Sequence, residues 1–536
     1  MEKGPPSVMP VWQVDSLTKV FEDAAPPAKP TSLIIEAARN EVVSAQFAVR
    51  AGAALNGLRC SVDALAGPGR AKIEDLRVRF VGSVNVKKNS DRSAIRKAPA
   101  RFPDPLLEDK QVDVAKGKTQ PVWITIRVPK KARPGTYTGQ VTFRAGDHRA
   151  VLPLAVEVFG ATLPDKRTLW VTNWTALPSR RRMELFVDFP WEPSQPGYWK
   201  LVRAYARNMA AHRQTVILTP IHQLVRVTAA DATLRFDFAL FDRWVKLFQD
   251  AGVIGRIEGG HLAGGRYGTT AHQSTAWAVE GGKAVRKRVS SWGKTHKDFL
   301  AQFLPAVQAH LAKKGWLKSY VQHVFDEPTP KNIARYKELA AVVRQHAPKL
   351  RTVEATHSHE LAGSIDVWVP QLDHYGKRLA FYQARQKAGD EVWFYTCCGP
   401  RDARHMNRFT DYPLLKVRLL HWINAKHGAT GYLHWGWNQW TRKDVYGDTE
   451  NHGRQWLPPG DKYIVYPKPG GVLDSIRSEA MLEGIQDYEL LRLLAAKNPK
   501  QAGEIMNSVV QSFTRYTVDP KKFRAARRTL LEALSQ

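Results

Sequence analysis

The first third of the chain alternates apolar and polar positions in short segments. The alternation is clearest at residues 33–51, 72–84, 119–129 and 135–146, and Pro, Gly, Asn and Asp occur between these segments. Such a two-residue period places one face of a strand against a core, and frequent turn residues favour antiparallel connections. We therefore predict an N-terminal antiparallel β-sandwich domain over residues 1–165, which ends at a linker near Pro164.

From residue 166 the pattern changes to short apolar runs that are separated by longer amphipathic helical segments. The runs lie at residues 169–175, 215–220, 254–262, 320–327, 351–358, 366–373, 391–398 and 431–440. Eight strands that alternate with helices are typical of a (β/α)8 TIM-type barrel, which we predict over residues 166–470. Only HELAGSI separates the fifth and sixth runs, which is too short for a full helix. Residues 471–536 are predicted as a C-terminal helical segment packed on the barrel.

Two adjacent carboxylates, Asp326 and Glu327, end the fourth apolar run in the stretch HVFDEP. An acidic residue before Pro328 is also a common way to begin a helix, so the pair alone does not decide its role. In a (β/α)8 barrel, however, catalytic residues come from the carboxyl ends of several strands. Two carboxylates in one barrel mouth would shift each other's pKa, and one of them could stay protonated near neutral pH.

Polar and aromatic side chains also follow the other predicted strands. We predict as substrate-binding residues Asn173, Trp174, His261, His357, Gln371, Asp373, Tyr375, Tyr395, Trp435, Trp437 and Asn438. A His taken singly is more often structural than catalytic, and a Trp packs in a core as often as it stacks on a ligand, so it is their joint placement that favours a site. Carboxylates among aromatic rings suit glycoside hydrolysis. Because the two carboxylates are neighbours, they suit the substrate-assisted variant, in which the 2-acetamido group of the sugar is the nucleophile.

The formal net charge is +30, from 80 Lys and Arg against 50 Asp and Glu. Such a charge attracts nucleic acid, anionic membranes or acidic glycans equally well. The basic clusters match no nucleic-acid-binding motif, so we predict solvated faces and no nucleic-acid partner. Arg266, Arg286, Lys287 and Arg288 follow the third predicted strand, which leads to the hypothesis that positive charge at the mouth selects anionic or sulfated glycans.

Other sequence features exclude several classes of protein. Three Cys cannot form a disulfide framework, and no metal-binding motif is present, so we expect no cofactor and no metal. No run of about 18 apolar residues occurs, and the start has no signal-peptide pattern. We expect no membrane insertion, and a soluble chain or a mature form from which an export signal has been removed. The sequence does not predict an oligomeric state.

Several long motifs resemble glycoside hydrolase family 123, the β-N-acetylgalactosaminidases, and its related barrel proteins. They are HVFDEP, DVWVPQ at the sixth run, GYLHWGWNQW at the eighth, and the terminal pattern with Ser475, Arg477, Glu479, Gly484, Asp487, Tyr488 and Glu489. The resemblance implies exo-acting, retaining release of terminal β-linked N-acetylhexosamine, most simply N-acetylgalactosamine, from an oligosaccharide or glycoconjugate.

In that family's mechanism, Asp326 would orient the acetamido group and Glu327 would act as general acid and then base. The resemblance also implies a periplasmic or extracellular location. Two alternatives stay open at this point: a glycosidase of the same fold that acts on a sugar without an acetamido group, with Asp373 or Glu258 as a separate nucleophile, and a non-catalytic glycan-binding protein.

Overall fold

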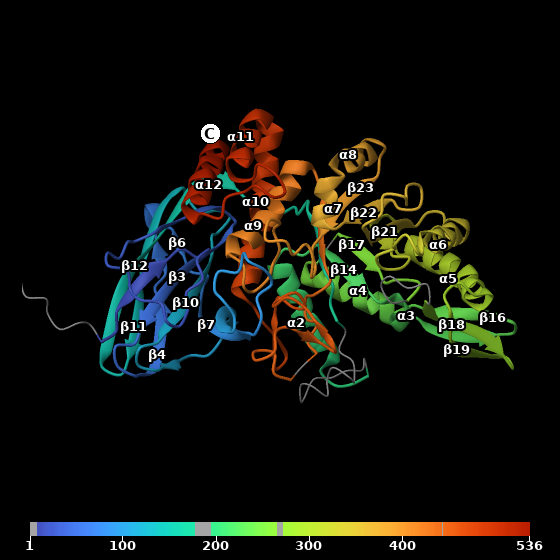
Figure 1. Ribbon diagram of the computed structural model, residues 1–536, viewed down its shortest axis with the longest axis horizontal. Helices are drawn as coiled ribbons and strands as arrows, with labels where there is room; N and C mark the ends of the chain where they lie inside the picture. Colours follow the sequence, from blue (N-terminus) through green and yellow to red (C-terminus); the bar gives the residue numbers. More distant parts are fainter. Residues whose placement is uncertain (1–7, 177–193, 254, 265–271, 442) are drawn as a thin grey trace, which may run out of the picture.

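The computed structural model describes residues 8–176, 194–253, 255–264, 272–441 and 443–536. Two packed β-sheets at the N-terminal end are followed by an eight-stranded barrel and then by helices at the C-terminal end (Figure 1). The predicted fold class is therefore confirmed.

Two sheets form the N-terminal part. The five-stranded sheet has the order β1 (Val11–Val14), β3 (Val42–Arg50), β10 (Thr119–Arg127), β7 (Leu76–Val86) and β8 (Ala100–Leu107). The seven-stranded sheet has the order β2 (Ile34–Arg39), β12 (His148–Thr162), β11 (Gly135–Ala145), β4 (Leu55–Val62) and β9 (Val112–Val114). In addition, β5 (Leu65–Ala66) pairs with β11, and β6 (Lys72–Ile73) pairs with β5. The neighbouring strands are antiparallel except β2 and β12, which are parallel, so the sandwich is not purely antiparallel.

The alternation seen in the sequence places one side of each strand in a shared core. In β11, Tyr137, Val141 and Phe143 are buried, while the residues between them are exposed or half-buried. They pack with Phe47 of β3 and Ile124 of β10, which belong to the opposite sheet. Burial of these apolar faces holds the two sheets together.

Eight parallel strands form the barrel. Their order is β13 (Trp170–Asn173), β24 (Gly431–His434), β23 (Glu391–Tyr395), β22 (Val367–Pro370), β21 (Arg351–Thr356), β20 (Tyr320–Gln322), β17 (Arg256–Gly259) and β14 (Val216–Thr219). Each strand lies within one of the eight predicted runs. The ring is nearly closed, because Thr215 N, just before β14, donates to Val171 O of β13 at 3.1 Å.

Helices cover the outside of the barrel. They are α2 (Tyr198–Ala211), α3 (Ile221–Leu224), α4 (Ala239–Ala251), α5 (Lys294–Lys313), α6 (Ile333–His346), α7 (Leu372–Lys377), α8 (Leu379–Lys387) and α9 (Leu414–His427). In α5, Phe299, Phe303 and Val307 lie on the buried face, as their spacing predicts. No helix separates β21 from β22, where the short HELAGSI segment lies.

Two hairpins are inserted between barrel elements. One consists of β15 (Arg226–Ala230) and β16 (Thr233–Asp237), and the other of β18 (Gln273–Glu280) and β19 (Lys283–Ser290). Figure 1 shows the β18–β19 hairpin at the end of the molecule that is farthest from the sandwich.

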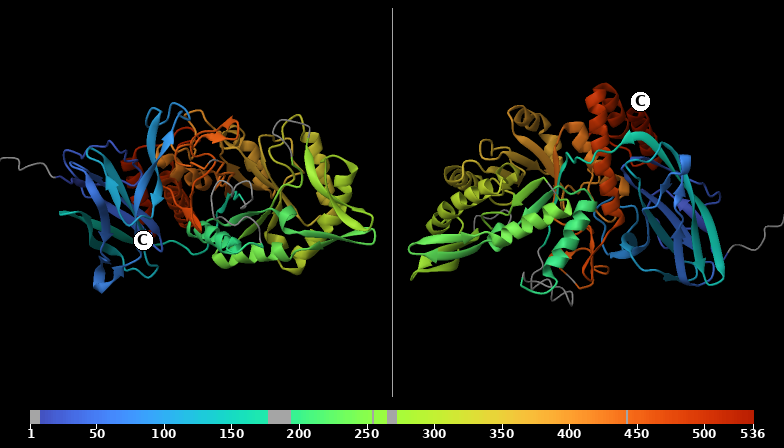
Figure 2. Two further views of the ribbon diagram at one scale, coloured as in Figure 1. Left: turned by 90° about the horizontal axis from the view of Figure 1, so that it is seen from below. Right: turned by 180° about the vertical axis from the view of Figure 1, so that it is seen from behind.

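The segment after β24 contains the short pairs β25 (Asn451–His452) with β26 (Gln455–Trp456) and β27 (Tyr466–Lys468) with β28 (Gly471–Leu473). The helices α10 (Ile476–Lys497), α11 (Pro499–Val509) and α12 (Pro520–Ser535) follow. They lie between the sandwich and the barrel in all views (Figures 1 and 2). Gly484 permits α10 to pack closely on α9, because a Cβ there would lie 2.4 Å from the carbonyl oxygen of Arg418.

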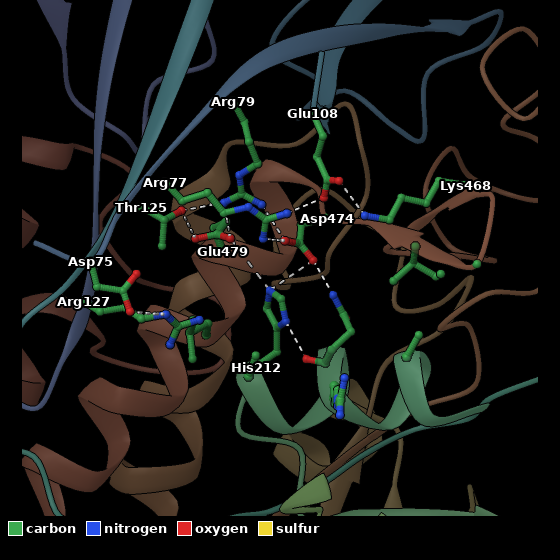
Figure 3. Close-up of a pocket in the computed structure, with 18 residues that line it drawn as sticks. Asp75, Arg77, Arg79, Glu108, Thr125, Arg127, His212, Lys468, Asp474 and Glu479 are labelled. Atoms are coloured by element: carbon green, nitrogen blue, oxygen red, sulfur yellow. Dashed lines mark hydrogen bonds and ion pairs between the residues drawn. The ribbon is translucent and has the colours of Figure 1, made fainter. Parts of the chain in front are cut away.

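A buried ion-pair cluster joins the sandwich to the rest of the chain at a cavity of about 360 Å³ (Figure 3). Arg79 of β7 is 1% exposed and donates to Glu479 of α10 at 2.8 Å and also to Asp474. His212, at the end of α2, lies 3.7 Å from Asp474 and 3.9 Å from Glu479. The guanidinium of Arg79 thus links the N-terminal sheet to the barrel side.

Within the described part of the chain, no helix is long and apolar enough to cross a membrane.

Candidate active site

A cavity of about 300 Å³ lies at the carboxyl ends of the barrel strands. Its walls come from the ends of β13, β20, β21, β23 and β24 and from the segment that follows β24. The lining residues among those described are Trp174, Asp326, Glu327, Ala355, Tyr395, Cys397, Cys398, Leu433, Trp435, His452, Gln455, Leu457 and Asp461. A larger hollow of about 470 Å³ lies mainly on the N-terminal sheets. The barrel mouth is the candidate site because catalytic residues of this architecture collect there.

Asp326 and Glu327 are neighbours in sequence, yet both line this cavity. Successive side chains of an extended strand point to opposite faces, so an unbroken strand would separate them. The strand β20 instead ends at Gln322, earlier than predicted, and Val324 N donates to Glu354 Oε2 at 2.9 Å. Glu327 then adopts a φ of +45°, in the left-handed region that few non-glycine residues occupy. Strained backbone of this kind clusters at functional sites.

Glu327 is held by a hydrogen-bond chain. The hydroxyl of Tyr395 donates to Glu327 Oε1, and its oxygen lies 2.6 Å from His357 Nε2, which is the donor in that bond. Burial and the neighbouring charge of Asp326 raise the pKa of Glu327 to about 7, although the Tyr395 hydrogen bond acts in the opposite direction. Burial, with a smaller effect from His374, lowers the pKa of His357 to about 4, so this ring is neutral. Glu327 can therefore hold or release a proton near neutral pH.

Asp326 lies on the other side of the pair, beside His261. Its side chain is 53% exposed and lines the cavity, and Nε2 of His261 lies 3.8 Å from its Oδ1. Partial desolvation in the cavity raises the pKa of Asp326, and the charge of Glu354 adds to this shift. The charges of His261 and His323 act in the opposite direction. His261 therefore lies close enough to interact with Asp326 electrostatically, without a hydrogen bond between them.

A buried cluster of charges lies behind Asp326. His323 Nε2 lies 2.7 Å from Glu258 Oε1 and its Nδ1 lies 2.8 Å from Glu354 Oε1, with all three side chains fully buried. Burial alone would lower the pKa of His323, but Glu354 and Glu258 outweigh it and raise the pKa to about 10. His323 is therefore an imidazolium that donates to both carboxylates. Glu354 also lies 3.4 Å from His261, which connects this cluster to Asp326.

Among the described residues, two groups of side chains have donor atoms close enough to surround a metal ion. They are His261 with His323 and Glu354, and His212 with Asp474 and Glu479. In the first group, both nitrogens of His323 carry protons for its carboxylate partners, so neither is free to bind a metal. In the second, the guanidinium of Arg79 already supplies the cation between the carboxylates. Neither group fits a resident metal.

A third carboxyl group, Asp461, lines the cavity and comes from the segment after β24. Its Oδ1 accepts a hydrogen bond from Trp435 Nε1 at 3.1 Å, while Oδ2 is buried and has no hydrogen-bond partner among the described residues. Burial raises the pKa of Asp461 to about 7, against the opposing effect of Trp435. Sequence reasoning missed this residue because it follows no strand and stands in no periodic pattern.

Six of the predicted substrate-binding residues lie at or next to the cavity. Trp174, Tyr395 and Trp435 line it. Directly behind these lie His261 and His357, which contact Asp326 and Tyr395 respectively. Gln371 also lies next to the cavity, because its side-chain amide donates to Sγ of the lining residue Cys397 at 3.3 Å.

Three predicted residues near strand ends do not line the cavity, and their contact with substrate stays a prediction. Asn173 is buried and accepts a hydrogen bond from Arg408 at 2.7 Å. Asn438 accepts one from Ala176 N at 2.7 Å. Trp437 is 3% exposed and packs into the main hydrophobic core. Trp174, which follows Asn173 directly, and Trp435, two positions before Trp437, line the cavity instead.

Tyr375 and Asp373 also make contacts outside the cavity, and substrate binding by them stays a prediction. The buried hydroxyl of Tyr375 donates to the carbonyl of His427 at 3.0 Å, and Asp373 accepts from Lys377 at 2.7 Å within α7. Neither lines the cavity. Glu258, the other candidate for a separate nucleophile, is fully buried in the cluster around His323.

Three of the basic residues after the third strand, those of the described part, do not line the cavity. Arg286, Lys287 and Arg288 lie in β19 of the projecting hairpin, and Lys287 pairs with Glu280 across it. Arg266 lies outside the described residues. The described lining contains no Lys or Arg and three carboxyl groups, which weighs against the hypothesis of an anionic sugar in this cavity.

Comparison with protein families decides the identity of this architecture. Residues 189–494 match the model of the glycoside hydrolase 123 catalytic domain, and residues 19–145 match that of the glycoside hydrolase 123 N-terminal domain. The chain belongs to glycoside hydrolase family 123. It is therefore a glycosidase, and its substrates are glycans.

One solved structure agrees on the fold. A family 123 glycoside hydrolase from Clostridium perfringens, described for glycolipid glycan hydrolysis, is 16% identical and matches with a TM-score of 0.77 over 99% of this chain and 97% of that one. A β-glucuronidase from Parabacteroides merdae (12% identity, 79% of this chain, 50% of that one, TM-score 0.29) and one from Bacteroides uniformis (10%, 86%, 51%, 0.26) are too dissimilar to support an inference. Comparison with curated proteins finds no match.

Proposed function

We propose that this family 123 glycosidase is an exo-acting, retaining enzyme that releases terminal β-linked N-acetylhexosamine by substrate-assisted catalysis, with N-acetylgalactosamine as the preferred sugar. The observation that carries the proposal is the presence of Asp326 and Glu327 on one cavity of about 300 Å³. That volume is at the low end for small-molecule sites and suits a single sugar rather than an extended chain. The indole of Trp435 offers a flat apolar face for it.

The two carboxyl groups divide the chemistry. Protonated Glu327 donates its proton to the glycosidic oxygen, while the carbonyl oxygen of the 2-acetamido group attacks the anomeric carbon. Asp326, which lies beside His261, accepts the acetamido N–H and stabilises the positive charge of the oxazolinium ring. Glu327, now a carboxylate that accepts from Tyr395, then removes a proton from water. Water attacks the anomeric carbon from the side of the departed group, so the configuration is retained.

Two features favour this scheme over its alternatives. A separate carboxylate nucleophile has no candidate in Asp373 or Glu258, which lie outside the cavity lining. A glycan-binding protein would have no need of a carboxyl group whose pKa is about 7 beside a second carboxylate.

The expected location in the periplasm or outside the cell stays a prediction.

Release of 4-nitrophenol from β-glycosides tests the proposal. We expect turnover of the N-acetylgalactosaminide, weaker turnover of the N-acetylglucosaminide, and none of the galactoside or glucoside. Asp326→Asn should lose most of this activity, because the acetamido group loses the charge that orients it. Turnover of a sugar without an acetamido group would refute substrate assistance, and failure of all four substrates would favour a binding protein.

Removal of the Tyr395 hydroxyl should shift the pH profile in a defined direction. Tyr395→Phe keeps the ring but removes a hydrogen bond that favours ionised Glu327. The pKa of Glu327 then rises, so the alkaline limb of kcat/KM should move to higher pH. Tyr375→Phe is the matched control, because its hydroxyl donates to a backbone carbonyl outside the cavity. An alkaline limb that stays in place in Tyr395→Phe would contradict this role.

A further inference from the structure

Two adjacent thiols at the end of β23 are not used by the proposed hydrolysis. Cys397 and Cys398 both line the catalytic cavity, and Cys398 is exposed. Their sulfur atoms lie 3.9 Å apart. They follow Tyr395, the partner of Glu327, by two and three positions. Anything held between these sulfurs would therefore lie at the catalytic carboxylates.

The position of Cys397 is fixed by two donors. Its Sγ accepts from Gln371 Nε2 at 3.3 Å and from Gly399 N at 3.4 Å. These contacts hold one sulfur in place, and the second sulfur is reached directly from the cavity. Cys60, the third cysteine, lies in β4 of the N-terminal sheet.

The spacing does not suit a disulfide but suits a bridging ion. Neighbouring residues in a trans chain have Cα atoms about 3.8 Å apart, which is below the range of about 4.4–6.8 Å found for disulfides. A tetrahedral ion with metal–sulfur bonds of about 2.3 Å separates two thiolates by about 3.8 Å. The observed 3.9 Å matches that separation.

The surrounding charge favours a cation. A hydrogen bond with Cys398, burial and the charges of Asp461 and Glu327 raise the pKa of the Cys397 thiol, so the thiol keeps its proton until an ion displaces it. The same carboxyl groups, with Asp326 in the same cavity, offer negative charge to a bound cation. Carboxylates beside thiols attract a soft divalent ion, and a site with two protein thiolates leaves further positions open to water. A trivalent arsenical that carries one organic group forms only two further bonds, so the two thiols are sufficient to hold it.

We propose that Cys397 and Cys398 form a dithiol site for thiophilic ions, such as Cd²⁺ and trivalent arsenicals, and that its occupation blocks the catalytic cavity. For an arsenical R–As=O, two As–S bonds form, the As–O bond breaks, and the two thiol protons leave with the oxygen as water. Arsenic stays trivalent, so no oxidant or reductant is needed. The inhibitory half of the inference rests on the proposed function, whereas the binding half does not.

Phenylarsine oxide provides the test, with intact-protein mass as a readout that is independent of activity. One equivalent should add a single phenylarsenic group to the native protein. The adduct should be lost in Cys397→Ser and in Cys398→Ser, retained in Cys60→Ser, and reversed by a dithiol but not by an equal concentration of a monothiol. Hydrolysis of the best glycoside substrate should fall in proportion to the fraction of adduct, and dithiol treatment should restore it.

The outcomes of this test distinguish binding of the ion by the dithiol from blocking of the catalytic cavity. An adduct that persists in both single serine variants, or that never forms in the native protein, would overturn the dithiol site. An adduct that forms as expected while hydrolysis continues undiminished would overturn the blocking of the cavity. If no glycoside is hydrolysed at all, the proposed function fails, and the mass measurement still decides whether the dithiol binds.

Discussion

Glu327→Gln should lower kcat by about 100- to 10,000-fold, the usual contribution of a general acid and base. Glutamine fills the same space and can still bond with Tyr395, but it has no proton to give to the glycosidic oxygen. The loss should be larger for natural glycans than for 4-nitrophenyl glycosides, because a good leaving group departs with little protonation. Steady-state kinetics on one substrate of each kind measures the difference.

The pH profile checks the same assignment. A general acid must be protonated, so kcat/KM of the native enzyme should fall as the pH rises through the pKa of Glu327, about 7. Asp326 must be ionised to accept the acetamido N–H, so activity should also fall as the pH drops through its raised pKa. The alkaline limb should vanish in Glu327→Gln and the acid limb should remain. An unchanged alkaline limb in the variant would assign it to another group.

Arg79→Met should lower the free energy of unfolding by about 3–5 kcal/mol, because it leaves buried carboxylates without their cation. Arg79 is 1% exposed, and its partners Asp474 and Glu479 are 5% and 4% exposed (Figure 3). The first unfolding transition in urea measures the effect. Arg77→Met is the matched control on the same strand: Arg77 is 50% exposed, and its loss should cost no more than about 1 kcal/mol.

The difference in the free energy of unfolding between the native protein and Arg79→Met should depend on pH. Burial alone would raise the pKa of Glu479, but Arg79 and His212 outweigh it and hold the pKa below its usual value. A carboxyl group of this kind stabilises the fold above its unfolded pKa of about 4 and loses that contribution as the pH falls toward the folded value. The penalty in Arg79→Met should therefore shrink below about pH 4. Equal midpoints of the first urea unfolding transition for Arg79→Met and Arg77→Met at neutral pH would contradict the role of Arg79 at the interface.

The barrel could be predicted because each strand coincides with an apolar run that helical segments separate. Asp326 and Glu327, which line the cavity, could be predicted for the same reason, since carboxylates end one of those runs. Asn173 and Trp437 do not line it, and the sequence does not show toward which side a residue just past a strand points. A shift of one position moves a side chain from the cavity to the surrounding core.

The rest of the site depends on contacts that the sequence pattern does not contain. Asp461 reaches the cavity through a segment without periodicity, more than twenty positions after β24. His323 and Glu354 stand inside apolar runs, and a charged residue buried in a predicted strand is the signal that could have found them. The left-handed turn at Glu327, which brings both carboxylates to one cavity, is a consequence of tertiary packing.

The central claim is that the acetamido group of the substrate, assisted by Asp326, is the nucleophile. The most direct measurement compares kcat/KM for 4-nitrophenyl β-galactosaminides that carry N-acetyl, N-fluoroacetyl, N-difluoroacetyl and N-trifluoroacetyl groups. Fluorine withdraws electrons from the amide carbonyl and makes it a weaker nucleophile. We predict that the rate falls steeply with each added fluorine. A rate independent of fluorination would show that another group attacks the anomeric carbon and would contradict this account.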